Sequence, residues 1–474
     1  MKAMKKSLMM RGMVLLHYGI TVLLFVSCWW LFYRHIAAGA VFGAVNISVY
    51  AFYAVSLLML SRIYSAYRVG LLHVGDLFYG QVLSNLISLG LTYLLACALA
   101  RRLINPLAGF GCAAVQALFS AGWTISANRL YFSLHKPKRT VVIYRDESDL
   151  RKLEEIRFFA ERWSVERTVQ WDEENVHDLP YKKETPGGRS FEAIQKLMRI
   201  MEDYEAVFVS GVSATLRNGI VKYCVEKNKA CYFVPHTGDV IISGAEHIRS
   251  FSVPICRARR SRPAPEYLLL KRAMDIVLSL LAIIVLSPFM ALAALAIWSY
   301  DRGPVLYKQV RLTKDGRTFE ILKLRSMIVD AEKGGARLAG EHDDRITPVG
   351  RIIRAIRFDE LPQLFNILKG DMSIVGPRPE RPEIAEQYRQ ELPAFDLRLQ
   401  VKAGLTGYAQ IYGRYNTEPQ DKLKMDLMYI NHASLAEDIK LIFATVRVLF
   451  LRESTSGVAE GQRTASAVDK EKSA

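Results

Sequence analysis

The sequence predicts a membrane protein of mixed class, in which four N-terminal transmembrane helices precede parts of α/β character. Hydrophobic residues make up 51% of the 474 residues, and many lie in near-continuous apolar runs within the first third of the chain. Runs of about 20 residues match the thickness of a bilayer. Beyond about residue 136 the hydropathy falls, and short apolar runs typical of buried strands alternate with helical patterns.

Composition limits the classes of partner. The formal net charge of +16 favours anionic partners such as lipid headgroups, phosphorylated substrates or nucleic acid. Nucleic acid is the weakest of these, because the basic residues lie beside membrane segments without interleaved aromatic residues. None of the six cysteines forms a C-x-x-C pair, so neither a disulfide framework nor a zinc site is indicated.

Region 1–135 is predicted to hold the four spans, at about 13–33, 38–60, 81–100 and 106–126. Basic residues before the first span place the N-terminus in the cytoplasm, and four crossings return the chain to that side. Arg101 and Arg102 fall on the opposite side in this count. Either they snorkel to the interface or one span is misjudged.

Region 136–256 resembles a small doubly wound domain. The strand-like runs "RTVVIYRDES" and "YEAVFVSGVS" are each followed by a helical pattern. A dinucleotide site needs a glycine-rich turn after the first strand, and "YRDES" supplies none. We therefore expect a degenerate Rossmann-like domain with a structural or regulatory role rather than a cofactor site. A basic linker, 257–265, follows it.

The apolar run "KRAMDIVLSLLAIIVLSPFMALAALAIW" is long enough to cross a bilayer, but it carries Ser287 and Pro288 in its middle. Proline removes a backbone donor, and the serine hydroxyl can bond to a carbonyl that this frees. A kinked spanning helix and a re-entrant helix both fit this pair of residues. Crossing would place the basic C-terminal part outside, so topology favours re-entry.

The segment "YKQVRLTKDGRTFEILKLRSM" predicts a β-hairpin that turns at Lys314-Asp315-Gly316. It presents Gln309, Arg311, Lys323 and Arg325. Lys323 and Arg325 are two residues apart, which places them on one strand face, where they could hold phosphate oxygens. A solvated basic edge strand would show the same pattern.

Two amphipathic helices are predicted to lie at a membrane surface. "RITPVGRIIRAIRF" places three isoleucines on one face and arginines elsewhere, and "DIKLIFATVRVLFLR" is apolar with interspersed cations. Anionic membrane lipids are the expected partners of both. The tail, 456–474, is small and polar and is expected to be disordered.

Asp359 and Glu360 lie in "RFDELPQLFN", just before a helical pattern that ends at Gly370. Helix N-capping is the commonest reason for an aspartate at such a position. The same position suits chemistry, because a helix N-terminus binds phosphate and keeps a carboxylate ionised. Such an aspartate can attack phosphorus.

Segment 266–455 resembles one family closely. The segments "DDRITPVGRIIRAIRFDELPQLFNILKGDMSIVGPRPE" and "KAGLTGYAQIYGR" look like the catalytic core of the bacterial sugar transferases, which are monotopic polyprenyl-phosphate hexose-1-phosphate transferases. The "KR..D" start and Ser287-Pro288 resemble that family's re-entrant helix. The four spans and the Rossmann-like domain resemble its larger members, but only in architecture.

The resemblance implies transfer of a hexose-1-phosphate from a UDP-sugar to undecaprenyl phosphate, with release of UMP, as the initiating step of exopolysaccharide, capsule or O-antigen synthesis. Asp359 would be the nucleophile and a ligand of Mg²⁺, and Glu360 would tune the metal or accept a proton. Phosphate and substrate contacts are implied for the remaining candidates, Lys323, Arg325, Arg354, Arg378, Gln309, Arg311, Gln410 and Arg414.

The expected location is the bacterial inner membrane, with the catalytic domain on the cytoplasmic face. A polytopic transferase would place its acids between many spanning helices, and only four spans precede this core. An inactive scaffold or regulator of polysaccharide assembly is the other alternative, which the intact Asp-Glu pair disfavours. The sequence does not tell which sugar is transferred or whether the chain forms a homo-oligomer.

Overall fold

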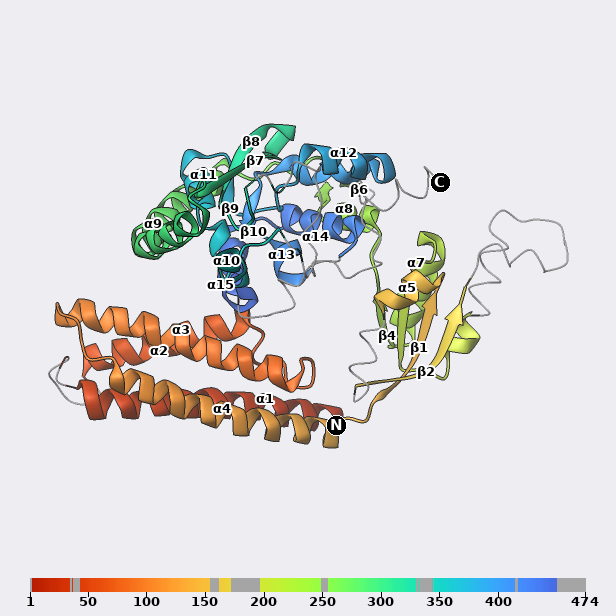
Figure 1. Ribbon diagram of the computed structural model, residues 1–474. Coiled ribbons are helices and arrows are strands. Elements are labelled where there is room, and N and C mark those ends of the chain that lie inside the picture. The colour runs from red at the N-terminus through yellow and green to blue at the C-terminus, as the bar shows by residue number, and fades with distance from the viewer. Residues whose placement is uncertain are drawn as a thin grey trace, which may run out of the picture. The chain divides into compact units, whose positions relative to one another are not determined.

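The computed structural model describes residues 2–34, 36, 43–153, 162–171, 197–248, 255–329, 331, 343, 345–413 and 417–449. These residues form two compact units, Met1–Pro235 and His236–Ala474. Figure 1 shows the long helices of the first unit, its small sheet, and the mixed second unit. The second unit begins before the predicted end of the α/β domain at 256, because the segment from His236 packs with the C-terminal core.

The N-terminal part of the first unit consists of long apolar helices. They are α1 (Lys2–Cys28, continued by a π-helical turn at Trp29–Tyr33), α2 (Ala44–Ile63), α3 (Val74–Ala100) and α4 (Leu107–Leu134). All four are long and apolar enough to cross a membrane. Polar side chains bond between them: Gln116 donates to Tyr53 Oη at 2.9 Å, and Thr124 donates to Gln81 at 2.8 Å. Such contacts join helices in an apolar medium.

The rest of the first unit is a parallel sheet with the order β2-β1-β3-β4. Its strands are β1 (Lys138–Tyr144), β2 (Trp163–Gln170), β3 (Ala206–Ser210) and β4 (Ala230–Phe233), with helices α5 (Glu147–Lys152) and α7 (Ala214–Glu226). The strand order reverses between β1 and β3, which is where such sheets bind ligands. There the Asp149 carboxyl group lies against Gly211, so a phosphate would meet a negative charge.

The second unit begins with α8 (Thr237–Ser243) and the short strands β5 (Glu246–Ile248) and β6 (Ile255–Arg257). Helix α9 (Pro265–Asp301) then runs for 37 residues and is the fifth helix long and apolar enough to cross a membrane. The predicted hairpin follows as β7 (Leu306–Leu312) and β8 (Thr318–Leu324), joined through a turn at Lys314–Gly316, which confirms the prediction.

The remaining elements pack around a main core and two smaller apolar clusters. They are α10 (Pro348–Ala355), a 3₁₀ turn η5 (Phe358–Glu360), α11 (Gln363–Lys369), β9 (Ser373–Val375), α12 (Pro382–Glu391), η6 (Pro393–Gln400), β10 (Gly404–Thr406), α13 (Tyr408–Tyr412), α14 (Pro419–Asn431) and α15 (Leu435–Leu449). Ile367, Met372, Leu423 and Leu441 are completely buried in this core. It fixes α11 beneath the hairpin, since Asn366 bonds to Leu322 N and Glu320 O.

Helices α9 and α10 each test a prediction from the sequence, the first about Ser287 and Pro288 and the second about the isoleucines. Pro288 lies inside continuous helix α9, and the Ser287 hydroxyl donates to Ile284 O at 3.0 Å, the carbonyl that proline leaves without its helical donor. Helix α10 is amphipathic, as predicted, but its isoleucines divide between the core and the surface. Ile353 is buried against α9 and β8, whereas Ile352 and Ile356 point outward and are 69% and 55% exposed.

Candidate functional site

The Asp359-Glu360 pair lies on the 3₁₀ turn η5 rather than on a helix. The N-cap of α11 is Pro362, without a side-chain cap bond, so the expectation that Asp359 caps this helix is wrong. Arg357 opens the turn with φ = 54°, a left-handed conformation that costs a non-glycine residue about 1–2 kcal/mol. The turn is therefore not fixed by a helix cap. The ion pairs of Glu360 with Lys323 and Arg378 fix it instead.

Cationic side chains of the protein itself balance the charge of the Glu360 carboxylate. Its Oε1 accepts from Arg378 Nη2 at 2.9 Å and from Lys323 Nζ at 3.3 Å. Burial alone would raise the pKa of Glu360, but Arg378, Lys323 and Arg357 together hold this pKa far below its usual range. Glu360 therefore stays ionised and fixes two cations at the site.

Asp359 differs from Glu360 both in its contacts and in the direction of its pKa shift. Among the described residues it forms no hydrogen bond or ion pair, although the charges of Lys323, Arg354 and Arg378 act on it. Burial and the charge of Glu360 raise the pKa of Asp359 above its usual range, and the three cations only partly offset this. The result is a carboxylate with free oxygens in a cationic surrounding, which is what a nucleophile toward a phosphate requires.

The structure brings together most of the predicted cations, but not all. Lys323, Arg354 and Arg378 gather around the pair. Arg311 lies near Arg378 and Lys323, donates to Gln309 Oε1 at 2.6 Å, and contacts Pro379 O at 3.2 Å. Burial lowers the pKa of Arg311 to about 10, so it remains charged at neutral pH.

Arg325 does not join this group. It follows the last residue of β8 and bonds to Asp301 at the end of α9, whereas Lys323 reaches Glu360. The two cations thus have different partners, although Arg325 N still donates to Val305 O at 2.8 Å next to the last pair of the hairpin. A joint contact with phosphate stays a prediction. Gln410 donates to Gly404 O at 3.4 Å, a contact within its own segment. Arg414 lies outside the described residues.

The sequence did not predict a group of charged residues behind the "PRP" segment, which we call the charge ring. It consists of Arg378, Glu380, Arg398 and Asp426. Arg398 is 4% exposed on its side chain, donates to Arg378 O at 2.9 Å and to Asp426 Oδ2 at 2.8 Å, and lies 3.7 Å from Glu380. Arg398 thus holds the backbone of the residue whose side chain reaches Glu360. Arg357 was missed as well, although its place in "RFDE" beside the pair offered a local signal.

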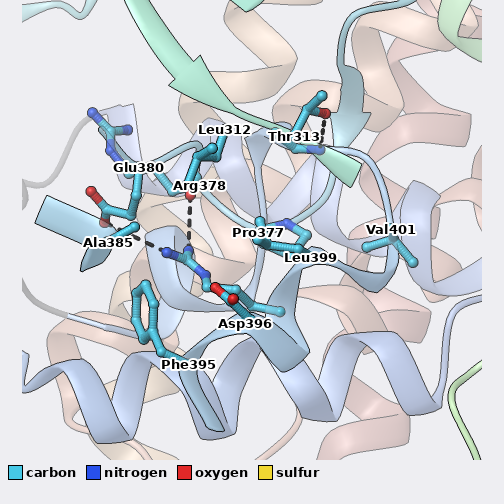
Figure 2. A pocket seen from close by; sticks show the side chains of 12 residues that line it. Leu312, Thr313, Pro377, Arg378, Glu380, Ala385, Phe395, Asp396, Leu399 and Val401 are labelled. Atoms are coloured by element: carbon cyan, nitrogen blue, oxygen red, sulfur yellow. Dashed lines mark hydrogen bonds and ion pairs between the residues drawn. The ribbon is translucent and has the colours of Figure 1, made fainter. Parts of the chain in front are cut away.

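A small pocket lies at this ring (Figure 2). In Figure 2 dashed lines mark the contacts of the central guanidinium with the backbone oxygen of Arg378 and with the Glu380 carboxylate. The pocket is lined by Leu312, Thr313, Pro377, Arg378, Glu380, Ala385, Phe395, Asp396, Arg398, Leu399, Val401 and Ala403. The carboxylate pair is not among these described lining residues, so the pocket adjoins Arg378 rather than Asp359 and Glu360.

A magnesium ion fits the pair only in part. No group of three or more His, Cys, Asp or Glu side chains among the described residues could hold a metal by itself. Magnesium is commonly bound by one or two carboxylates together with substrate phosphates. Asp359 has oxygens to offer for such a shared site, whereas one oxygen of Glu360 already accepts from two cations.

Comparison with known proteins identifies the family of this chain. The family model for the bacterial sugar transferase matches residues 266–452. A putative undecaprenyl-phosphate N-acetylgalactosaminyl 1-phosphate transferase of Bacillus subtilis is 47% identical over 152 residues, which are 32% of this chain and 85% of that protein. The chain belongs to the bacterial sugar transferase family.

Larger members match over less of their own length. The UDP-glucose:undecaprenyl-phosphate glucose-1-phosphate transferase of Escherichia coli is 35% identical over 280 residues, or 56% of this chain and 60% of that protein. The UDP-N-acetylgalactosamine-undecaprenyl-phosphate N-acetylgalactosaminephosphotransferase of Aeromonas hydrophila is 42% identical over 190 residues, 40% and 45% of the two chains. The matched part spans about half the length of these two relatives. The segment matched by the family model, 266–452, includes the Asp-Glu turn, the hairpin and the "PRP" segment.

Proposed function

We propose that this sugar transferase moves a hexose-1-phosphate from a UDP-sugar to undecaprenyl phosphate at the cytoplasmic face of the bacterial inner membrane. The observation that carries the proposal is the division of roles within one carboxylate pair. Arg378 and Lys323 balance the charge of Glu360, while Asp359 lies beside the same cations without a hydrogen bond or ion pair to any described residue. The names of the related proteins support the two substrates.

In the first step an Asp359 carboxylate oxygen attacks the β-phosphorus of the UDP-sugar. The bond between that phosphorus and the oxygen bridging to the α-phosphate breaks, and UMP leaves with this oxygen. In the second step a phosphate oxygen of undecaprenyl phosphate attacks the same phosphorus. The bond to Asp359 then breaks, which frees the carboxylate and yields the lipid diphosphate sugar.

The surrounding cations have separate tasks in this scheme. Arg354 and Arg378 hold phosphate oxygens, and Lys323 balances charge between Glu360 and the transferred group. Mg²⁺, when bound to Asp359 and the substrate phosphates, would supply screening of the negative charges that meet there. Glu360 orients Arg378 and Lys323 toward the phosphates through the contacts at 2.9 and 3.3 Å.

The test uses the full chain in nanodiscs, undecaprenyl phosphate, and a panel of UDP-sugars, with UMP release as the readout. We expect release with at least one UDP-sugar and none with Asp359→Asn. Incubation without the lipid acceptor should leave a phosphosugar on Asp359 that mass spectrometry of the peptide detects. An inactive scaffold would release no UMP with any donor. Appreciable turnover by Asp359→Asn would remove Asp359 as the nucleophile.

A further inference from the structure

Four cations gather beside the C-terminal end of α11, apart from the cations at the carboxylate pair. They are Arg272, Lys314, Arg317 and Lys402, which we call the α9 cation cluster. Arg272 comes from α9 and donates to Ile367 O at 2.6 Å and to Leu368 O at 2.7 Å. These bonds fix its guanidinium against the last carbonyls of α11.

Gly370 leaves room between two members of this cluster. Its φ of 97° ends α11 in a left-handed conformation that favours glycine. A Cβ atom at this position would lie 3.4 Å from Arg272 Nη2 and 3.7 Å from Lys402 Nζ. The guanidinium and the ammonium therefore approach the same point of the backbone, and Gly370 places no side chain between them.

The acids near this cluster have other partners, since the Asp371 carboxylate lies 3.2 Å from Lys369 Nζ. Burial lowers the pKa of Lys402, and the charges of Arg272, Arg317 and Lys314 lower this pKa further, against the opposite effect of Asp275. The Asp275 carboxylate is buried and accepts from Ile374 N at 3.0 Å. Within the part of the chain that the structure describes, none of the four cations forms an ion pair.

The position of the cluster points to a membrane surface. Arg272 is the last cation before the apolar part of α9. Large apolar side chains there face outward, with Leu281, Ile284 and Val285 54%, 62% and 65% exposed. A helix of this length and composition enters the hydrocarbon layer, so the residue at its polar start lies at the level of the headgroups.

We propose that the α9 cation cluster binds the phosphate of an anionic phospholipid headgroup and thereby holds the start of α9 at the membrane surface. Charge complementarity supports this occupant, since clustered lysines and arginines beside a membrane helix attract anionic lipids. The open space at Gly370 lets a phosphate oxygen approach both Arg272 and Lys402. The proposal does not depend on the transfer reaction, because lipid binding is measured without either substrate.

The experiment is native mass spectrometry of the full chain in detergent, titrated with phosphatidylglycerol or with phosphatidylcholine. The test variant carries Lys402→Gln and Arg317→Gln. The matched control carries Lys308→Gln and Arg389→Gln, two cations that already pair with Glu320 and Asp396. We expect the test variant to lose about tenfold in phosphatidylglycerol affinity and the control to match the unmodified protein.

Phosphatidylcholine binding should be weak and equal in all three proteins. Equal phosphatidylglycerol affinity in the test and control variants would overturn the proposal. Inorganic phosphate distinguishes the source of the ligand: if it displaces the lipid at millimolar concentration, the cluster is a free-phosphate site and the lipid assignment fails. Lys402→Gln alone changes one exposed side chain, so it provides the same comparison should the double variant fold poorly.

Discussion

Arg378 donates to Glu360 at 2.9 Å, and through this contact the "PRP" segment meets the turn that carries Asp359. The charge of Glu360 raises the pKa of Arg378, and Arg378 lowers that of Glu360, so both stay ionised. The Arg378 side chain is still 44% exposed. It can therefore hold Glu360 and face a substrate phosphate at the same time.

This geometry separates three arginines that look alike in the sequence. Arg354 and Arg378 act on Asp359, whereas Arg351 is exposed and has no such influence among the described groups. We expect Arg354→Ala and Arg378→Ala each to lower the rate of UMP release by roughly 100-fold or more, and Arg351→Ala by less than about threefold. Equal and mild losses at all three positions would show that these arginines only form a solvated face.

The ionised Asp359 carboxylate should lower the stability of the folded protein. Its pKa is raised in the folded protein, so its ionised form is less favourable there than in the unfolded chain, and the penalty is felt above the folded pKa. We expect Asp359→Asn to raise the thermal midpoint in nanodiscs at pH 7.5 by roughly 2–4 °C. The gain should shrink as the pH falls and Asp359 itself takes up a proton. A lower midpoint for the variant would mean that the carboxylate stabilises the turn.

Local sequence pattern predicted those parts of the structure that depend on near neighbours. The hairpin turn at Lys314–Gly316, the stop of α11 at Gly370 and the bond from Ser287 to Ile284 O each involve residues within a few positions of one another. Turn chemistry and helix termination act over such distances. These predictions needed no knowledge of the tertiary structure.

The errors arose where tertiary contacts override local pattern. Strand periodicity grouped Arg325 with Lys323, but the Arg325 side chain bonds to Asp301, whereas Lys323 reaches Glu360. The contact of Arg398 with Asp426 joins residues 28 positions apart, which no local motif reveals. Asp359 looked like a cap because the pattern did not show that a 3₁₀ turn separates it from α11.

Substitutions of Arg357 test whether its strained backbone conformation is needed for activity. Glycine adopts φ = 54° without penalty, so Arg357→Gly should stabilise the protein by about 1 kcal/mol if the side chain contributes nothing to folding. The Arg357 charge acts on Glu360 and Asp359, so the same variant should lose about tenfold or more in activity. Arg357→Lys should keep most of the activity. If stability and activity fall together in Arg357→Gly, the residue is structural.

Asp426 gives a pH dependence with a definite sign. Burial raises the pKa of Asp426 to about 6, despite Arg398, so the folded protein binds this proton more tightly than the unfolded chain, where the pKa is about 3.9. Its contribution to stability is complete below about pH 4 and is lost as the pH rises through 6. The stability of the unmodified protein relative to Asp426→Asn should therefore increase between pH 7.5 and 5, by roughly 1 kcal/mol. Thermal unfolding of both proteins across this range gives the slope, and a slope of opposite sign would show that the ion pair with Arg398 outweighs burial.

The pair Ser287-Pro288 decides how α9 meets the membrane. The Ser287 hydroxyl satisfies Ile284 O inside the helix, so a bend at Pro288 would leave this carbonyl with a donor even in an apolar medium. We predict that α9 re-enters, because basic residues on both sides of it favour the cytoplasmic face. Cysteines introduced at 262 and 326 should then react with a membrane-impermeant reagent from the same face, with the native cysteines replaced. Pro288→Leu should remove the residue that favours a bend, so that part of the population spans the membrane, labels at 326 from the opposite face and loses activity in cells. Opposite-face labelling in the unmodified protein would make α9 a spanning helix, and Asp359 would then lie on the side away from the predicted supply of UDP-sugar.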